Sequence, residues 1–255
     1  MVEATSRGQQ FKAWRRKIVH RLGAKFLRGI RAFQGRHSRI STAPVLDNAT
    51  FDWVPRLEAE WRQIRSEFER VWAHPEDIPA FHQLSPDQAR ISKGDHWKVY
   101  ALYVFGNRIH PNCGECPVTA ELLSGLPGLQ NAWFSTLAPG YHISPHRGPT
   151  RALVRCHLAL CVPEQAEKCW IRVDQQICHW EEGKCLLFDD TYEHEVANDT
   201  PEFRTVLFLD FDRPMDRLGT SFNRCLLAMM QATAYVKDPI RNLAEWNRRL
   251  SERAP

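Results

Sequence analysis

Hydrophobic positions follow different periods in different parts of this 255-residue chain. Between residues 54 and 71, apolar side chains recur in steps of three and four, which predicts a helix with one buried face. From about residue 97 to 212, short apolar or alternating runs separated by turn-forming residues predict strands. These runs are Trp97–Phe105, Ala132–Leu137, Ala152–Val162, Cys169–Val173, Lys184–Phe188 and Arg204–Phe211. The chain ends in helical sequence, with Asp238 and Pro239 expected as its N-cap and first turn.

The many short strands predict a mainly β protein with flanking helices, built as a β-sandwich or a closed jelly roll. Residues 40–50 have the composition of a connector. We therefore expect two parts: a basic N-terminal arm with its connector over residues 1–45, and a strand domain with flanking helices over residues 46–255. The second part is long enough to bury a substantial hydrophobic core.

Charge sets the N-terminal arm apart from the rest of the chain. The first 40 residues carry eleven basic side chains and one acid, a net charge of +10, whereas the other 215 residues carry −6. Apolar residues recur among these charges at helical spacing: Phe11, Trp14, Ile18, Leu22, Phe26, Ile30 and Phe33. This pattern predicts an amphipathic helix over residues 11–33. Three roles stay open for it: contact with an anionic membrane, packing on the domain, and a mitochondrial presequence.

The remaining composition narrows the class of protein. No run approaches the ~18 apolar residues that span a bilayer, and the N-terminus lacks the features of an export signal. The eight cysteines are therefore expected to be reduced thiols in a cytoplasmic protein, with a peripheral position at the inner face of the membrane as the alternative. Cys113 and Cys116 have metal-ligand spacing and His110 lies nearby, so a zinc site and a turn with two thiols both stay open.

Three polar residues in the strand region could carry chemistry. His146 stands at an expected strand end, and His194 stands where an acidic turn meets an apolar run. Two histidines that face into a barrel from separate strands can hold a divalent iron and leave coordination positions open. Arg204 opens an apolar strand, so it can point inward and bind a dicarboxylate. Taken alone, a residue of each of these kinds is more often an ordinary turn, core or surface side chain, and only the combination indicates an iron site.

The combined motifs resemble one known family. The strings HRGPTRALVRCHLAL, HWEEGKCLLFDDTYEHEV and FRTVLFLDFDRP are similar to those of the aspartyl/asparaginyl β-hydroxylases, a family of iron(II)- and 2-oxoglutarate-dependent oxygenases. The resemblance covers roughly residues 95–215. It implies a double-stranded β-helix core, a jelly roll of cupin-like type with helices packed outside. It also implies a dioxygenase that uses iron(II), 2-oxoglutarate and O2 to hydroxylate an unactivated C–H bond.

The resemblance implies roles for particular residues. His146 and His194 resemble the two iron ligands. Arg204 resembles the residue that pairs with the distal carboxylate of 2-oxoglutarate, and Ser135 resembles its hydroxyl partner. The other positions that match the co-substrate pocket are Arg155, His157 and Trp97.

Gly148 departs from the pattern of the wider oxygenase superfamily, in which an Asp or Glu at this position is the third iron ligand. The family shares this gap, and water is thought to fill it. Halogenating relatives also lack the carboxylate, but the surrounding HRGP and HEV strings favour hydroxylation. Asp189 and Asp190 are candidates for a replacement ligand, although we expect them to orient the histidines or to form a turn.

The substrate is less well defined than the chemistry. Family members hydroxylate the β-carbon of Asp or Asn side chains in proteins, and related branches hydroxylate acyl chains of lipid A and ornithine lipids. The HRGP motif favours the peptide or protein substrate, narrowly, whereas the basic arm favours a lipid at a membrane surface. A non-catalytic jelly-roll binding protein is the alternative from another class. Nucleic acid is not the expected partner, although a basic helix with Trp and Phe could contact phosphates.

Overall fold

A computed structural model describes residues 25–252, and the predictions for residues 1–24 lie outside this range. Its strands form two antiparallel sheets. In spatial order the major sheet contains β1 (Val45–Leu46), β9 (Cys185–Phe188), β6 (Leu153–Cys161), β11 (Arg204–Asp212), β4 (Leu129–Leu137), β2 (Trp97–Val104) and β3 (Asn107–Arg108). The minor sheet contains β5 (Tyr141–His146), β10 (His194–Asn198), β7 (Cys169–Val173) and β8 (Gln176–His179). Two facing sheets with helices packed outside confirm the predicted jelly roll.

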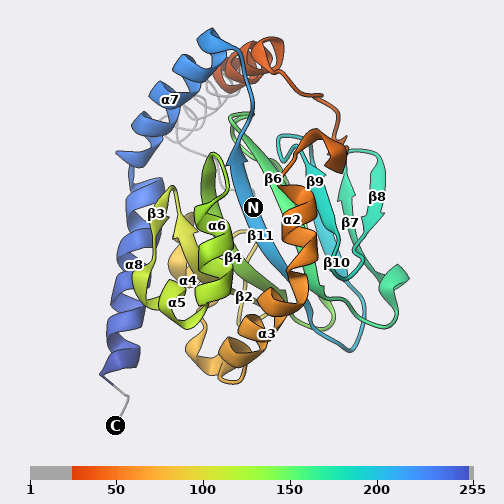
Figure 1. Ribbon diagram of the computed structural model, residues 1–255, viewed down its shortest axis with the longest axis vertical. Helices are drawn as coiled ribbons and strands as arrows, with labels where there is room; N and C mark the ends of the chain where they lie inside the picture. Colours follow the sequence, from red (N-terminus) through yellow and green to blue (C-terminus); the bar gives the residue numbers. More distant parts are fainter. Residues whose placement is uncertain (1–24, 253–255) are drawn as a thin grey trace, which may run out of the picture.

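Helices cover the outer face and one edge of this sandwich. They are α2 (Val54–Ala59), α3 (Trp61–Trp72), α4 (Phe81–Leu84), α5 (His110–Glu115), α6 (Pro117–Ser124), α7 (Arg217–Gln231) and α8 (Ala234–Ser251). Figure 1 shows α2, α3 and α6 in front of the major sheet, with the long α8 along one side. The helix predicted over residues 54–71 is therefore confirmed as two segments, which join at Glu60.

The hydrophobic core has two layers, one on each face of the major sheet. The outer layer joins α3 and α6 to side chains such as Phe134 and Leu209. The inner layer lies between the sheets and includes Phe188 and Val206 of the major sheet and Ile171 of the minor sheet. Because successive strand residues face opposite sides, each long strand of the major sheet contributes to both layers. This explains the nearly continuous apolar run of β11.

A buried carboxylate fixes two of the outer helices to each other. Glu67 of α3 is 2% exposed and accepts hydrogen bonds from the backbone N–H groups of Val118 and Thr119, which begin α6. These N–H groups have no partner inside their own helix, so the carboxylate satisfies them and is itself stabilised. The two helices are thereby held in register over the sheet.

At both ends of the described chain, the structure differs from the elements predicted from the sequence. The last helix begins at Ala234, with Thr233 as N-cap, so the prediction that Asp238 and Pro239 start it was wrong. Pro239 lies inside α8 at the loss of one backbone hydrogen bond, and the helix continues because Val236 and Leu243 bury the same face in the core.

At the other end, residues 25–37 are helical, and Phe33 packs on Phe222 of α7 with ring centroids 4.7 Å apart. At the predicted boundary between the two parts, β1 pairs with β9, so the connector adds a strand to the major sheet. The division into parts at residue 45 stays a prediction. In the described range, no helix is both long enough and apolar enough to cross a membrane.

Candidate active site

The two candidate iron ligands meet across neighbouring strands of the minor sheet. His146 is the last residue of β5, His194 is the first residue of β10, and the two are register partners. Their ring centroids lie 4.1 Å apart. β5 and β10 were not among the predicted strands, but the expected placement of both histidines at strand ends agrees with the structure.

Hydrogen bonds to the backbone fix the tautomer of both rings. Nδ1 of His146 lies 2.8 Å from the carbonyl oxygen of Ser144, and Nδ1 of His194 lies 3.0 Å from that of Tyr192. A carbonyl only accepts, so each Nδ1 must carry the proton, and each Nε2 is left with a lone pair. Nε2 of His194 is buried and has no hydrogen-bond partner among residues 25–252. Second bonds of this kind orient the histidines that bind metals, so the pair fits a divalent cation.

Burial keeps both imidazoles in the form that binds metal. It lowers the pKa of His146 to about 4, and it lowers the pKa of His194 well below the usual range, with the neighbouring His146 acting in the same direction. Both rings are therefore neutral near pH 7, and a metal ion does not have to displace a proton from them.

Arg204 supplies a buried positive charge to the same cavity. The residue is 1% exposed, and its guanidinium lies over the ring of Trp180 at 4.4 Å from the centroid. Burial lowers its pKa to about 10, and in the described chain only the thiol of Cys169 opposes this effect. Its Nε has no hydrogen-bond partner within residues 25–252. A buried guanidinium in this state favours an anionic ligand, because an uncompensated buried charge is costly.

The remaining predicted residues line this cavity. The Ser135 hydroxyl accepts a hydrogen bond of 2.9 Å from the indole N–H of Trp97. His157 is 5% exposed, and neither of its ring nitrogens has a partner in the described chain. Burial and the charges of Arg204 and Arg155 lower its pKa well below the usual range. All seven predicted residues line one cavity, between the two sheets: Trp97, Ser135, His146, Arg155, His157, His194 and Arg204.

Comparisons with known proteins agree with this geometry. The family model described as aspartyl/asparaginyl beta-hydroxylase matches residues 58–214. The ornithine lipid ester-linked acyl 2-hydroxylase of Rhizobium tropici is 39% identical over 214 residues, which cover 84% of this chain and 76% of that protein. This chain belongs to the aspartyl/asparaginyl β-hydroxylase family. It is therefore a hydroxylase of the 2OG-Fe(II) oxygenase type.

Other proteins are similar to a smaller share of this hydroxylase. Human aspartyl/asparaginyl beta-hydroxylase is 36% identical over 166 residues, which cover 63% of this chain and 21% of that protein. Among solved structures, a 2OG-Fe(II) oxygenase family oxidoreductase from Burkholderia pseudomallei matches at 12% identity and a TM-score of 0.42, covering 64% of this chain and 92% of that one. The fold assignment for the hydroxylase rests on its own two sheets.

Arg155 of the hydroxylase lies in the cavity but already has anionic partners. Its Nε donates to Asp210 at 2.9 Å, and its Nη2 lies 3.1 Å from Asp190. Against the effect of burial, these two carboxylates raise the pKa of Arg155. Arg155 and Arg204 therefore differ: the first is neutralised within the chain, and the second is not.

Asp190 occupies the space that the missing third ligand would need. A Cβ built on Gly148 would lie 2.2 Å from Oδ2 of Asp190, and the Gly148 N–H donates to the Asp190 carbonyl at 2.7 Å. Glycine is thus required here because a neighbouring carboxylate fills the position. Burial raises the pKa of Asp190 to about 6, although Arg155 acts in the opposite direction. The sequence offered no sign that these two residues touch.

A second buried carboxylate, that of Asp189, holds the loops around the site, in keeping with the orienting role expected for it from the sequence. Asp189 is 0% exposed and pairs with Arg213 and Arg151, each at 2.7 Å. It also accepts hydrogen bonds from the backbone and hydroxyl of Thr191. Its neighbours on the loop before β10 are thereby fixed, including the carbonyl of Tyr192 that orients His194. Charged residues inside otherwise apolar strings were the available signal.

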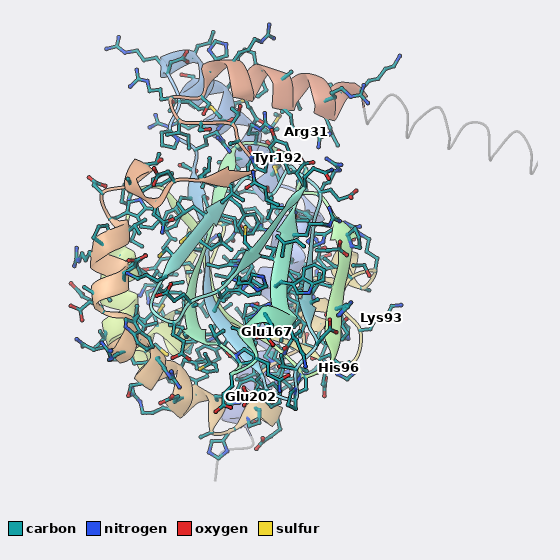
Figure 2. The ribbon with its side chains drawn as sticks, turned by 90° about the vertical axis from the view of Figure 1, so that its right-hand side faces the viewer. Arg31, Lys93, His96, Glu167, Tyr192 and Glu202 are labelled. Carbon is teal, nitrogen blue, oxygen red and sulfur yellow. The ribbon has the colours of Figure 1, made fainter. Side chains whose placement is uncertain are left out.

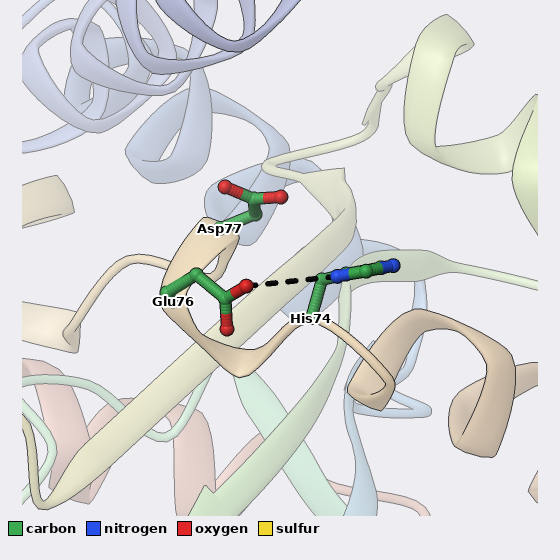
Figure 3. A group of neighbouring side chains, drawn as sticks. All are labelled: His74, Glu76 and Asp77. Atoms are coloured by element: carbon green, nitrogen blue, oxygen red, sulfur yellow. Dashed lines mark ion pairs between the residues drawn. The ribbon is translucent and has the colours of Figure 1, made fainter. Parts of the chain in front are cut away.

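Two other groups of potential ligands lie outside the cavity. The thiols of Cys113 and Cys116 are buried in the outer core, and burial raises the pKa of Cys116 to about 12, which favours the packing interpretation over zinc. In the part of the chain that the structure describes, the one cluster of three possible ligands is His74, Glu76 and Asp77. Figure 3 shows these side chains beside one turn, where all three are exposed. Exposed groups of this kind are common without a metal, so we assign no site to them.

Proposed function

We propose that this protein uses iron(II), 2-oxoglutarate and O2 to hydroxylate the acyl chain of a membrane lipid of the ornithine-lipid type. One observation carries the chemistry: two neutral histidines with free Nε2 atoms share a cavity with Arg204, a buried cation with no carboxylate partner in residues 25–252. The lipid substrate is supported by the relative from Rhizobium tropici, whose similarity extends over 84% of the chain.

In this proposal His146 and His194 hold the iron through Nε2, and Arg204 with the Ser135 hydroxyl binds the distal carboxylate of 2-oxoglutarate. When bound, iron with 2-oxoglutarate and O2 supplies oxidative decarboxylation to succinate and CO2 together with hydroxylation of a C–H bond. Neutral His157 offers a ring N–H to the co-substrate. The aromatic rings of Trp180, Phe188 and Phe208 surround His157. In this proposal they exclude water from bound 2-oxoglutarate, which strengthens the attraction between its carboxylate and Arg204.

The position of the N-terminal helix also favours a lipid substrate. Figure 2 shows Arg31 of this helix and Tyr192 at the same end of the molecule, whereas His96 and Glu202 lie at the opposite end. Tyr192 is the residue whose carbonyl orients His194, so the helix lies at the end of the sandwich that holds the histidines. An enzyme that acts on membrane lipids needs its site close to the bilayer surface.

The described part of the helix has the composition of a membrane-binding surface. Its exposed apolar side chains are Phe26, at 70%, and Leu27, at 36%. Lys25, Arg28 and Arg36 are exposed on the same helix. Basic side chains beside exposed apolar ones suit an anionic membrane surface. Part of the predicted arm thus packs on the domain through Phe33, and part of it is free to meet a membrane.

Hydroxylation of Asp or Asn side chains is the second candidate. It was the narrow first choice from the sequence motifs, and the human relative supports it with 36% identity. The comparisons favour the lipid because the bacterial relative is similar over more of this chain and over more of its own length.

The experiment is a direct competition between the two substrates. Purified protein with iron(II) and 2-oxoglutarate is given ornithine-lipid vesicles or Asp-containing peptides, and succinate and the added oxygen atom are measured by mass spectrometry. We expect hydroxylated lipid and stoichiometric succinate, neither of which the His194→Ala variant forms. Hydroxylated peptide with unmodified lipid would establish the second candidate. Absence of iron-dependent 2-oxoglutarate binding would overturn the assigned roles of the cavity residues.

A further inference from the structure

A second, larger hollow leads away from the cavity along the same sheet. This lateral cleft lies over the inner face of β2, β4 and β11 and under α4 and α8. Its apolar lining consists of Phe81, Leu84, Ile91, Trp97, Val99, Ala101, Val104, Phe105, Trp133, Phe208, Pro239 and Leu243. The nature of this lining predicts a hydrophobic occupant.

The lateral cleft is continuous with the candidate active site. Trp97, His146, Arg155 and Phe208 line both hollows. Strand register places His157, Phe208, Trp133 and Ala101 side by side across four neighbouring strands. This row begins in the cavity at His157 and continues through the stacked rings of Phe208 and Trp133, 4.2 Å apart, to Ala101. A chain with one carbon at the histidines can therefore extend along the row.

The adjacent row of the sheet is polar, but its groups are already satisfied. Asp210 pairs with Arg155 and accepts a hydrogen bond of 3.0 Å from the amide of Asn131. The Asn131 oxygen in turn accepts from the backbone N–H of Phe105 at 2.9 Å. Among the described residues that line the cleft, the one buried polar side-chain atom without a partner is the indole nitrogen of Trp133. An uncharged donor of this kind can bind a carbonyl group, and it supplies no countercharge for a buried carboxylate.

Two cations lie at the outer part of the lining. Arg90 and Arg147 are both exposed, with 52% of the Arg147 side chain in solvent, and Nη2 of Arg147 lies 3.6 Å from a carboxylate oxygen of Glu193. An apolar interior next to exposed cations complements an amphiphile that has a hydrocarbon chain and a carboxylate or phosphate in its headgroup. A peptide with a short Asp side chain would leave the far part of the cleft, around Leu84 and Leu243, without an occupant.

We propose that the lateral cleft binds the hydrocarbon chain of the substrate lipid and that Ala101 limits how far this chain extends. The inference rests on the proposed lipid hydroxylation and adds a binding site and a determinant of chain length. Ala101 has the smallest side chain of the row and is 1% exposed, so a larger residue there removes volume from the cleft. Leu243 of α8 lines the cleft as well, and shortening it adds volume.

The test compares Ala101→Leu with Leu243→Ala on lipids that differ only in acyl length, in steps of two carbons. For Ala101→Leu we expect turnover of the longest chains to fall at least ten-fold, with the shortest chains unaffected. Leu243→Ala should move the optimal acyl length to longer chains. Because the two variants shift the length profile in opposite directions, the test still works if one of them fails to fold. Ala244→Leu adds the same volume at an exposed position of α8 and should keep the wild-type profile.

Binding measured without turnover separates this inference from the proposed function. Lipids with a brominated acyl chain should quench tryptophan fluorescence in the anaerobic iron(II) and 2-oxoglutarate complex. Trp133→Phe should remove part of that quenching, and Trp97, which also lines the cleft, should account for the remainder. Quenching without lipid hydroxylation would support the cleft and overturn the proposed function. Lipid hydroxylation with one length profile in Ala101→Leu, Leu243→Ala and the wild type would overturn the cleft and leave the proposed function intact.

Discussion

The cavity and the lateral cleft lie on one face of the same sheet, but they differ in which polar groups lack partners. In the cavity, within the described chain, these are Nε2 of His194, both ring nitrogens of His157 and Nε of Arg204. In the cleft, Arg155, Asp210 and Asn131 satisfy one another. Because a buried polar group without a partner is costly, the difference indicates where a charged ligand is required. This difference fits the proposed binding of a charged co-substrate in the cavity and of an uncharged chain in the cleft.

The cover over the sheet explains this division. The minor sheet brings β5 and β10, with their histidines, over β6 and β11. At the other side, α4 and α8 place Leu84 and Leu243 over β2. One sheet can thus serve two ligands because two kinds of element face it. We therefore expect mutations in the cavity and mutations in the cleft to affect different properties of the protein.

Loss of a candidate ligand should have the largest effect. His194→Ala removes one of two expected iron ligands. Loss of a residue that only orients a metal ligand typically costs roughly 10–100-fold in affinity or activity, and we expect turnover of His194→Ala to fall by more than this. Iron(II) affinity, measured by anaerobic titration, should fall with it. Conversion of a cleft residue, Leu243→Ala, should leave iron affinity unchanged. Equal iron affinity in His194→Ala and the wild type would remove the basis for calling the cavity a metal site.

The contrast between the two arginines should appear first in stability. Arg155→Met leaves the carboxylates of Asp210 and Asp190 buried without their cation, which typically costs about 3–5 kcal/mol. We expect this loss in the free energy of unfolding, from urea titration of the metal-free protein. Arg204→Met removes a cation with no carboxylate partner in residues 25–252, so it should not destabilise the metal-free protein. Similar losses for both variants would show that the two arginines do not differ in this way.

For 2-oxoglutarate affinity we expect the opposite order, with the larger loss in the Arg204 variant. Arg204→Met should weaken 2-oxoglutarate binding by about 2–5 kcal/mol, the range for truncating one partner of a buried charged pair. Arg204→Lys should restore only part of it, because an ammonium lacks the planar fork that matches a carboxylate. Anaerobic titration of the iron(II) protein measures both. An unchanged dissociation constant in Arg204→Met would make Arg204 a structural residue.

Much of the sandwich was predictable from sequence because six strands carry an apolar pattern of their own. β5 and β10 were missed for a physical reason. β5 is an edge strand in which only Ile143 is buried and Pro145 interrupts the pattern, and β10 is short. These are the strands that bring His146 and His194 together. Family motifs, and not periodicity, therefore pointed to the site.

The partners of the charged residues could not be predicted without the strand order. Arg155 meets Asp210 because β6 and β11 are neighbours in register. Asp190 reaches Gly148 through a backbone hydrogen bond between two loops that are far apart in sequence. A sequence displays the charges along one dimension, and their neutralisation depends on the fold. For this reason Arg155 and Arg204 looked equivalent until their surroundings were known.

Gly148 offers a test at the point where the cavity meets the cleft. Gly148→Ala places a methyl group where the Asp190 carboxylate lies, and overpacking of this kind costs about 1–3 kcal/mol. The loss in unfolding free energy should be smaller when Asp190→Ala is already present, because that change opens the space. A double-mutant cycle measures this coupling. Strict additivity of the two changes would mean that the carboxylate and the added methyl group do not compete.

A further expected effect is a pH dependence of the metal-free protein that arises in the cavity. Burial lowers the pKa of His146 from its ordinary value of 6.5 to about 4, so between these values the unfolded chain binds more protons than the folded one. His146 therefore contributes stability that is present above pH 6.5 and is lost as pH falls toward 4. Asp190, with its pKa raised to about 6, acts in the opposite direction in an overlapping range, so a difference measurement is needed. His146→Gln should show a smaller decrease in unfolding free energy than the wild type on acidification from pH 6.5 to 4. Parallel stability curves for the two proteins would show that His146 does not titrate differently in the folded state.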